Sequence, residues 1–281
     1  MSDEPNTISR REFTALSIAA GVAAATGASG ATAAQMVDRD VQVATAAGVC
    51  DAALIHPSGG SWPGVILFTD VFGLRPTMRD MAKRLAADGF TVLVPNPFYR
   101  TTKAPGLSTD IDFNNPADRA KIDTLRAPLT SDAVMQDATA YVKFLDSQST
   151  VNKKAKMGVF GYCMGGPMTM RTAATFPDRI GAGASFHGAN LATDKPESPH
   201  LLVPKMKARY LIAIAENDDQ RDPAAKNLLR EAFDKASLKA EIEVYAGTMH
   251  GWCVLDSKVY NQEQAEKAWG RMLALFKTAL A

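Results

Sequence analysis

The stretch "GVFGYCMGG", residues 158–166, places Cys163 in the pattern Gly-x-Cys-x-Gly-Gly. An apolar run precedes the cysteine and a helical pattern follows it, so Cys163 is expected on a sharp strand-to-helix turn. Side chains two residues on either side would collide there, and Gly161 and Gly165 remove both collisions. The start of the next helix favours a thiolate. The motif predicts a nucleophile, and a passive thiol in a glycine-rich turn is the alternative.

Two partners for such a nucleophile follow it along the chain. The stretch "AIAENDD" offers Asp218 and Asp219 after an apolar run, and "VYAGTMHGW" places His250 after the last apolar run. The order nucleophile, acid, histidine is typical of an elbow of this kind. Asp218 is predicted as the acid because it lies three residues after Ala215, and Asp219 remains the alternative.

The other three histidines fit the pattern less well. His56 lies in a turn rich in Pro, Ser and Gly, and His200 lies in a long connection. His187 also ends a predicted strand, but that strand precedes the one carrying Asp218, which breaks the expected order. We therefore predict His250 as the catalytic base and expect His187 at the pocket wall.

Strand and helix patterns alternate along the chain. Partial alternation of apolar and polar side chains predicts edge strands at residues 37–46 and 49–55. Apolar runs predict buried strands at residues 64–70 and 90–95. Further strands are expected at residues 156–161, 179–186, 208–215 and 240–246. Helical patterns follow Pro76, start at Pro223, and cover residues 131–147, 164–176 and 261–280. This alternation predicts the α/β class, with a mostly parallel sheet covered on both faces.

Residues 96–130 have a different character. They contain prolines, aspartates and asparagines and show little periodicity. A segment of this length without a pattern of its own is often a functional loop. We expect it to form a lid or a fixed wall of a binding pocket.

The composition excludes several classes of protein. The chain has 281 residues, 46% hydrophobic and 22% charged, enough for one large globular domain. A net charge of +1 argues against nucleic acid as a partner, because phosphate binding needs concentrated Lys and Arg. Three cysteines are too few for a disulfide framework and lack the spacing of a zinc site. We expect neither a metal nor an organic cofactor.

The N-terminus, residues 1–33, resembles a twin-arginine export signal. Arg10 and Arg11 stand together, and a weakly apolar stretch rich in Ala, Gly and Thr leads to a cleavage point after Ala33. A membrane anchor would need about 20 strongly apolar residues, and Gly, Thr and Ser dilute this stretch. The pattern predicts a periplasmic or secreted protein without a stable membrane anchor, and a disordered or membrane-lying tail is the alternative. Residues 34–281 would form a single domain.

Over residues 37–280 the chain resembles the dienelactone hydrolase family of α/β hydrolases. The resemblance rests on "GYCMGG", the "AEND" strand exit, the "HGW" loop and "DVFGL" at residues 70–74. It implies an α/β-hydrolase fold, a small ester or lactone as substrate, and an oxyanion hole formed by the backbone amides of Val71 and Met164.

The chain departs from the family pattern in two places. One concerns the hydrogen bond to the resting thiol, and the other concerns binding of the substrate carboxylate. Asp70 stands where the family has a glutamate that is thought to hydrogen-bond the resting thiol, and the aspartate is shorter. Family members that cleave dienelactones grip the substrate carboxylate with arginines, and Arg100 stands at one matching place. No arginine follows His250 in "HGWCVLD". The chain therefore resembles the family without resembling a dedicated dienelactone enzyme.

The chemistry that these residues predict is ester hydrolysis through a thioacyl enzyme. His250, oriented by Asp218, would accept the proton of Cys163, whose thiolate attacks a carbonyl carbon. Because a thiolate leaves more readily than a simple alkoxide, activated esters such as enol lactones are the expected substrates. A thiol redox sensor and a binding module without catalysis are the alternatives.

Four further residues have two interpretations each. Arg100 would be a solvated surface arginine or an anion contact. Trp252 would line the pocket or pack in the core, and packing is favoured. Cys50 and Cys253 would be free or paired as a disulfide in an oxidising compartment.

Overall fold

The structure is a computed structural model, and it describes residues 35–281. The proposed export signal at residues 1–33 lies outside the described residues. Within residues 35–281, eight strands form one sheet in the order β1-β2-β4-β3-β5-β6-β7-β8. Their bounds are β1 Met36–Thr45, β2 Gly48–Pro57, β3 Gly64–Phe68, β4 Thr91–Pro95, β5 Met157–Tyr162, β6 Ile180–Phe186, β7 Arg209–Ala215 and β8 Ala240–Tyr245.

The sheet is parallel from β4 to β8, and β1 and β2 join its edge in antiparallel pairing. Every residue of β3, β4 and β5 is buried, as expected of apolar strands covered on both faces. The predicted α/β class is confirmed. Because β5, β7 and β8 are parallel, their carboxyl ends lie at one edge of the sheet, where ligand sites form in such folds.

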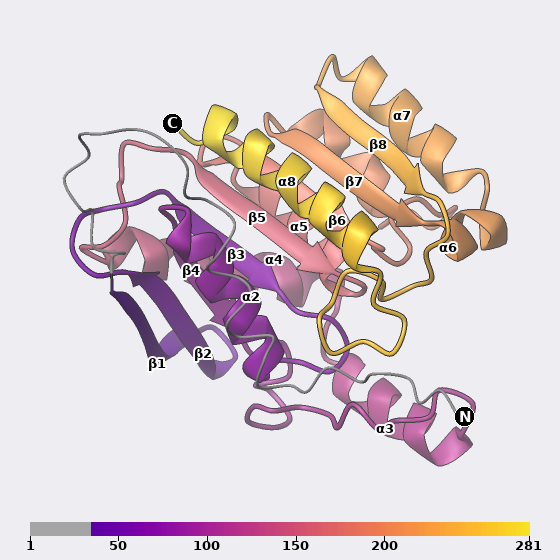
Figure 1. Cartoon of the computed structure of the whole chain (residues 1–281), viewed down its shortest axis with the longest axis horizontal. Helices are drawn as coiled ribbons and strands as arrows, with labels where there is room; N and C mark the ends of the chain where they lie inside the picture. Colours follow the sequence, from indigo (N-terminus) through magenta and orange to yellow (C-terminus); the bar gives the residue numbers. More distant parts are fainter. Residues whose placement is uncertain (1–34) are drawn as a thin grey trace, which may run out of the picture. The chain divides into compact units, whose positions relative to one another are not determined.

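Helices cover both faces of the sheet (Figure 1). On one face lie α2 (Pro76–Ala87) and α8 (Gln262–Ala279), and on the other lie α4 (Ser131–Ser147), α5 (Gly165–Thr175) and α7 (Ala225–Lys235). The sheet therefore separates two apolar cores. Cys50 is buried in the core beneath α4, and Cys253 is buried in the core beneath α8. The considered disulfide between them is wrong, because the sheet lies between the two thiols and both are free.

Two helices went unpredicted in the sequence. Helix α3 (Pro116–Arg126) lies within the segment 96–130, and only Ile122 and Leu125 on it are buried, too few to produce a periodic signal. Asn115 caps it by accepting a hydrogen bond from the amide of Ala117. The short helix α6 (Glu216–Arg221) follows β7 directly and has no buried residue.

The connection from β6 to β7 contains a 3₁₀ helix, η1 (Pro199–Lys205). No helix among residues 35–281 is both long enough and apolar enough to cross a membrane.

Candidate active site

The turn that carries Cys163 has the predicted elbow geometry. Cys163 lies between β5 and α5 with φ of 51°, a left-handed conformation that a non-glycine residue rarely adopts. Its amide donates to the carbonyl of Phe186 at 3.1 Å. A Cβ on Gly161 would lie 2.6 Å from the carbonyl oxygen of Gly165, and a Cβ on Gly165 would lie 2.4 Å from that of Phe68. The steric role predicted for both glycines is confirmed.

His250 and Asp218 meet at the same edge of the sheet. His250 follows β8 and Asp218 lies on α6, and the distance from His250 Nδ1 to Asp218 Oδ2 is 2.6 Å. The side chain of Asn217 holds the loop by accepting a hydrogen bond from the His250 amide at 2.8 Å. Asp219 points elsewhere and binds Lys226 at 2.6 Å, because adjacent residues of a helix diverge by about 100°. Of the two candidate aspartates, only Asp218 contacts the histidine.

The imidazole of His250 lies between Asp218 and Cys163. Burial of the ring disfavours its charged form, but hydrogen bonds to Asp218 and Cys163 outweigh burial and raise the pKa of His250 from 6.5 to about 10. A protonated imidazole beside the sulfur is the environment in which a cysteine reacts as a thiolate. The arrangement can therefore generate a nucleophile and move a proton.

His187 lies beside this pair. Its ring centroid is 4.7 Å from that of His250, its φ is 39°, and only 2% of the residue is exposed. Neither ring nitrogen has a hydrogen-bond partner within the described residues. Burial, followed by the proximity of His250, lowers the pKa of His187 well below its usual value. His187 is therefore a neutral wall of the cavity at neutral pH, as its strand-end position suggested.

The two residues whose amides are expected at the oxyanion hole, Val71 and Met164, lie at the cavity that contains Cys163. Neither amide donates a hydrogen bond to another group in the part of the chain that the structure describes. Both remain available for a ligand oxygen.

Asp70 is held by an arginine that the sequence analysis missed. Arg75 donates to Asp70 Oδ1 at 2.7 Å and to Oδ2 at 2.9 Å, and it binds Asp256 at 2.7 and 2.9 Å. Burial raises the pKa of Asp70 against the opposing effect of Arg75. No hydrogen bond joins Asp70 to Cys163 within residues 35–281. A signal for Arg75 was present, since it directly follows "DVFGL".

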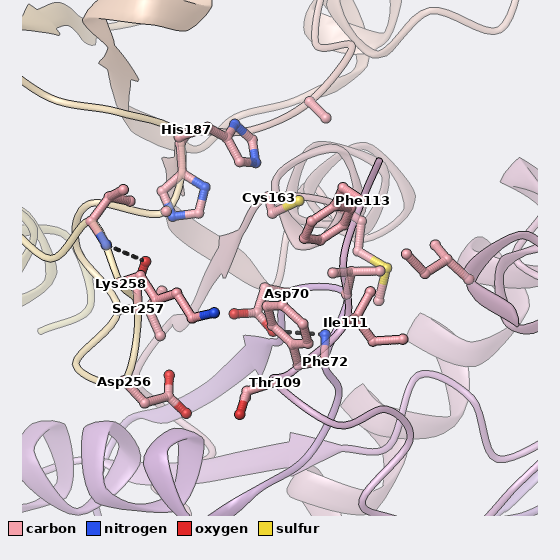
Figure 2. Close-up of a pocket in the computed structure, with 18 of the residues that line it drawn as sticks. Asp70, Phe72, Thr109, Ile111, Phe113, Cys163, His187, Asp256, Ser257 and Lys258 are labelled. Atoms are coloured by element: carbon pink, nitrogen blue, oxygen red, sulfur yellow. Dashed lines mark hydrogen bonds between the residues drawn. The ribbon is translucent and has the colours of Figure 1, made fainter. Parts of the chain in front are cut away.

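The cavity beside Cys163 has a volume of about 580 Å³. Its walls come from the loop after β3, the segment 109–126 and the loop at 250–259. In Figure 2, Cys163 and His187 lie at one end of the cavity, and Thr109 and Asp256 lie at the other. From the segment 96–130, for which a lid or a fixed wall was expected, residues between 109 and 126 line this cavity. Among the described residues, no cluster of three His, Cys, Asp or Glu side chains could hold a metal.

Two residues considered for substrate contact lie outside the cavity. Arg100 binds Asp137 of α4 at 2.6 and 2.9 Å and lies over the ring of Tyr99, so its guanidinium is occupied within the fold. Trp252 is fully buried and stacks on Tyr245 with ring centroids 4.7 Å apart. Neither residue lines the cavity beside Cys163, and Trp252 packs in the core, as the packing interpretation expected.

The sheet order and the elbow after β5 define an α/β-hydrolase fold. Residues 50–280 match the dienelactone hydrolase family, and the chain belongs to that family of hydrolases.

Individual relatives agree with this assignment. The chain is 30% identical to "Protein usf" of Aquifex pyrophilus, covering 78% of this chain and 89% of that protein. It is 26% identical to the "Putative carboxymethylenebutenolidase" of Synechocystis sp., covering 79% and 88%. The structure of P91, a dienelactone hydrolase-like promiscuous phosphotriesterase from metagenomic libraries, is similar in fold. That comparison has a TM-score of 0.72 and 19% identity and covers 88% of this chain and 99% of that one.

Proposed function

We propose that the chain hydrolyses activated carboxylic esters and lactones with Cys163 as nucleophile, His250 as proton carrier and Asp218 as the residue that orients it. The observation that carries this proposal is the contact of His250 with Asp218 at 2.6 Å, at a cavity that His250 lines together with Cys163 on the elbow. A nucleophile, a base in contact with it and a third group that orients the base are the parts of a catalytic triad.

Acylation begins when His250 takes the proton of Cys163 and the sulfur attacks the carbonyl carbon. The carbonyl oxygen becomes an oxyanion, and the amides of Val71 and Met164, which line the same cavity, would donate to it. One such donor is typically worth about 3 kcal/mol in the transition state. The bond to the leaving oxygen then breaks, and the protonated His250 supplies that oxygen with its proton.

Deacylation regenerates the thiol. His250, now neutral, accepts a proton from water while the water oxygen attacks the thioester carbon. The bond from carbon to sulfur breaks, the carboxylic acid leaves, and the thiolate of Cys163 recovers its proton. No cofactor takes part in the proposed cycle.

The cysteine favours activated substrates. In the tetrahedral intermediate the thiolate competes with the alcohol oxygen as leaving group, and an alkoxide from a simple alkyl ester is the poorer of the two. Enol and aryl esters release stabilised anions and proceed forward.

We also propose export of the protein, which the pair Arg10 and Arg11 and the apolar stretch after them support.

The test is steady-state hydrolysis of matched enol, aryl and alkyl acetates by the full chain and by Cys163→Ala. We expect the substitution to lower kcat/KM by about 10⁴-fold or more, and the wild type to rank enol and aryl above alkyl acetates. Cys253→Ala, which removes a buried thiol outside the cavity, is the control and should retain activity. Equal turnover by wild type and Cys163→Ala would contradict the proposal.

A further inference from the structure

The wall of the cavity across from the elbow is apolar and partly exposed. Phe72 follows the Asp70 loop and Phe113 comes from the segment before α3, and their rings meet edge to face with centroids 6.0 Å apart. Ile111, Val254 and Val259 extend the same lining. Phe113 remains 52% exposed although it lines the cavity. A half-exposed aromatic ring at a pocket is surface that a ligand can cover.

Arg75, the buried cation that lines the cavity, is not free to bind an anion. Both hydrogen-bonding edges of the Arg75 guanidinium are occupied, one by Asp70 and the other by Asp256. Arg75 is only 7% exposed. A substrate carboxylate would have to displace one of these carboxylates. The loop after His250 adds Val254 and Asp256 to the lining and contributes no arginine. Of the three arginines that line the cavity among the described residues, Arg75 is thus already paired with two carboxylates.

The other cations of the cavity are solvent-exposed and share its lining with exposed carboxylates. Arg119, Arg126 and Lys258 are exposed, and the same lining contains the exposed carboxylates of Asp110 and Asp123. Exposed charges of this kind contribute little to binding, because water and salt screen them. They do not replace a buried carboxylate clamp.

We infer that the substrate is a neutral ester with a bulky apolar group, and that Phe113 and Phe72 select that group. The inference rests on the proposed hydrolase function and adds the class of substrate. A cavity of about 580 Å³ lies in the range that encloses a drug-sized ligand, far more than an acetyl group fills. Covering Phe113 and the aliphatic lining removes apolar surface from water, which favours binding in proportion to the area covered.

The test uses two matched pairs of substrates on the full chain. In the first pair, p-nitrophenyl valerate and mono-p-nitrophenyl glutarate share leaving group and chain length and differ in a terminal methyl or carboxylate. In the second, the acetates of 4-propylphenol and of 3-(4-hydroxyphenyl)propanoate place the same difference on the alcohol side. We expect kcat/KM to favour the neutral member by about tenfold or more in at least one pair, and the charged member in neither.

Two substitutions at one exposed position sharpen this test. Phe113→Ser should reduce the preference for the neutral ester by about fivefold, mainly through KM, because the apolar cover is lost. Phe113→Arg should shift the preference toward the carboxylate ester, since it adds an unpaired cation to the wall. Leu201→Ser is the control, because Leu201 is 51% exposed on η1 and does not line the cavity. It should leave both ratios unchanged.

The outcomes separate this inference from the proposed function. Hydrolysis of every ester through Cys163 with no preference, or with preference for a carboxylate ester, would overturn the inference and leave the function standing. Unchanged ratios in both Phe113 variants would remove Phe113 as the determinant. Absence of Cys163-dependent hydrolysis of any ester would contradict the proposed function itself.

Discussion

Asp70 and Asp218 occupy comparable positions and have opposite chemistry. Asp70 follows β3, Asp218 follows β7, and each contacts a basic side chain at the carboxyl edge of the sheet, at 2.7 and 2.6 Å. Asp70 binds Arg75, with side chains that are 8% and 6% exposed. Asp218 binds His250, with side chains that are 18% and 31% exposed. The first pair is more deeply buried than the second.

The difference between the two pairs lies in the basic partner. A guanidinium keeps its proton throughout the pH range in which proteins fold, so Arg75 can fix the loop at residues 70–75 but cannot exchange a proton. An imidazole gains and loses its proton near neutral pH and can do both. An aspartate therefore anchors a loop at the end of β3, and another aspartate supports proton transfer at the end of β7.

The largest effect, on kcat/KM, is expected when the pair of Asp218 and His250 is broken. Asp218→Asn keeps the shape of the side chain but removes the charge that orients and stabilises the imidazolium of His250. We expect kcat/KM for an aryl ester to fall by about 10⁴-fold, with little change in the free energy of unfolding. Steady-state kinetics and urea denaturation measure the two quantities.

Asp219→Asn is the matched control for that experiment. Asp219 binds Lys226 on the neighbouring helix and makes no contact with His250. We expect its kcat/KM to stay within about twofold of the wild type, as for a salt bridge near the surface. A large loss with Asp219→Asn and a small one with Asp218→Asn would reverse the assignment of the acid.

A smaller effect, on stability, is expected when the pair of Asp70 and Arg75 is broken. Arg75→Met leaves the buried carboxylate of Asp70 and the partly exposed carboxylate of Asp256 without their cation. We expect the free energy of unfolding to fall by about 3 kcal/mol. Lys226→Met, which breaks a more exposed pair, should cost less than about 1 kcal/mol. Equal losses in urea denaturation would mean that burial of the Arg75 pair has no energetic consequence.

The smallest effect concerns pH. The pKa of His250 is raised from 6.5 to about 10, so the folded state holds the proton more tightly than the unfolded chain. This contribution is fully present below about pH 6.5 and is lost as the pH rises toward 10. Relative to His250→Gln, the wild type should lose about 1.5–3 kcal/mol of stability across that window, the size of a hydrogen bond to a charged group. Denaturation of both proteins from pH 6 to 10 measures it, and a constant difference would contradict it.

The fold and the order of the site residues were predictable because they depend on local patterns. Apolar runs and helical periodicity located all eight strands to within about two residues at most ends, which is the usual uncertainty of element boundaries. The glycines around Cys163 indicated the elbow, because only a sharp turn requires them at that spacing. Parallel strand ends then placed Asp218 and His250 at the same edge as Cys163.

Several features of the site were not predictable, since they depend on side chains brought together from distant segments. Helix α3 buries only two residues and carries almost no periodic signal. Arg100 matched a family position but binds Asp137. Arg75 binds the nearby Asp70 and also Asp256, which lies 181 residues further along the chain.

The sequence by itself determined the α/β class, the nucleophile elbow and the strand ends from which its partners come, because backbone sterics and apolar periodicity are local properties. Only the tertiary structure decided which aspartate contacts His250, which arginine is occupied and which aromatic ring lines the cavity. Those outcomes depend on the direction of each side chain and on the charges that surround it after folding.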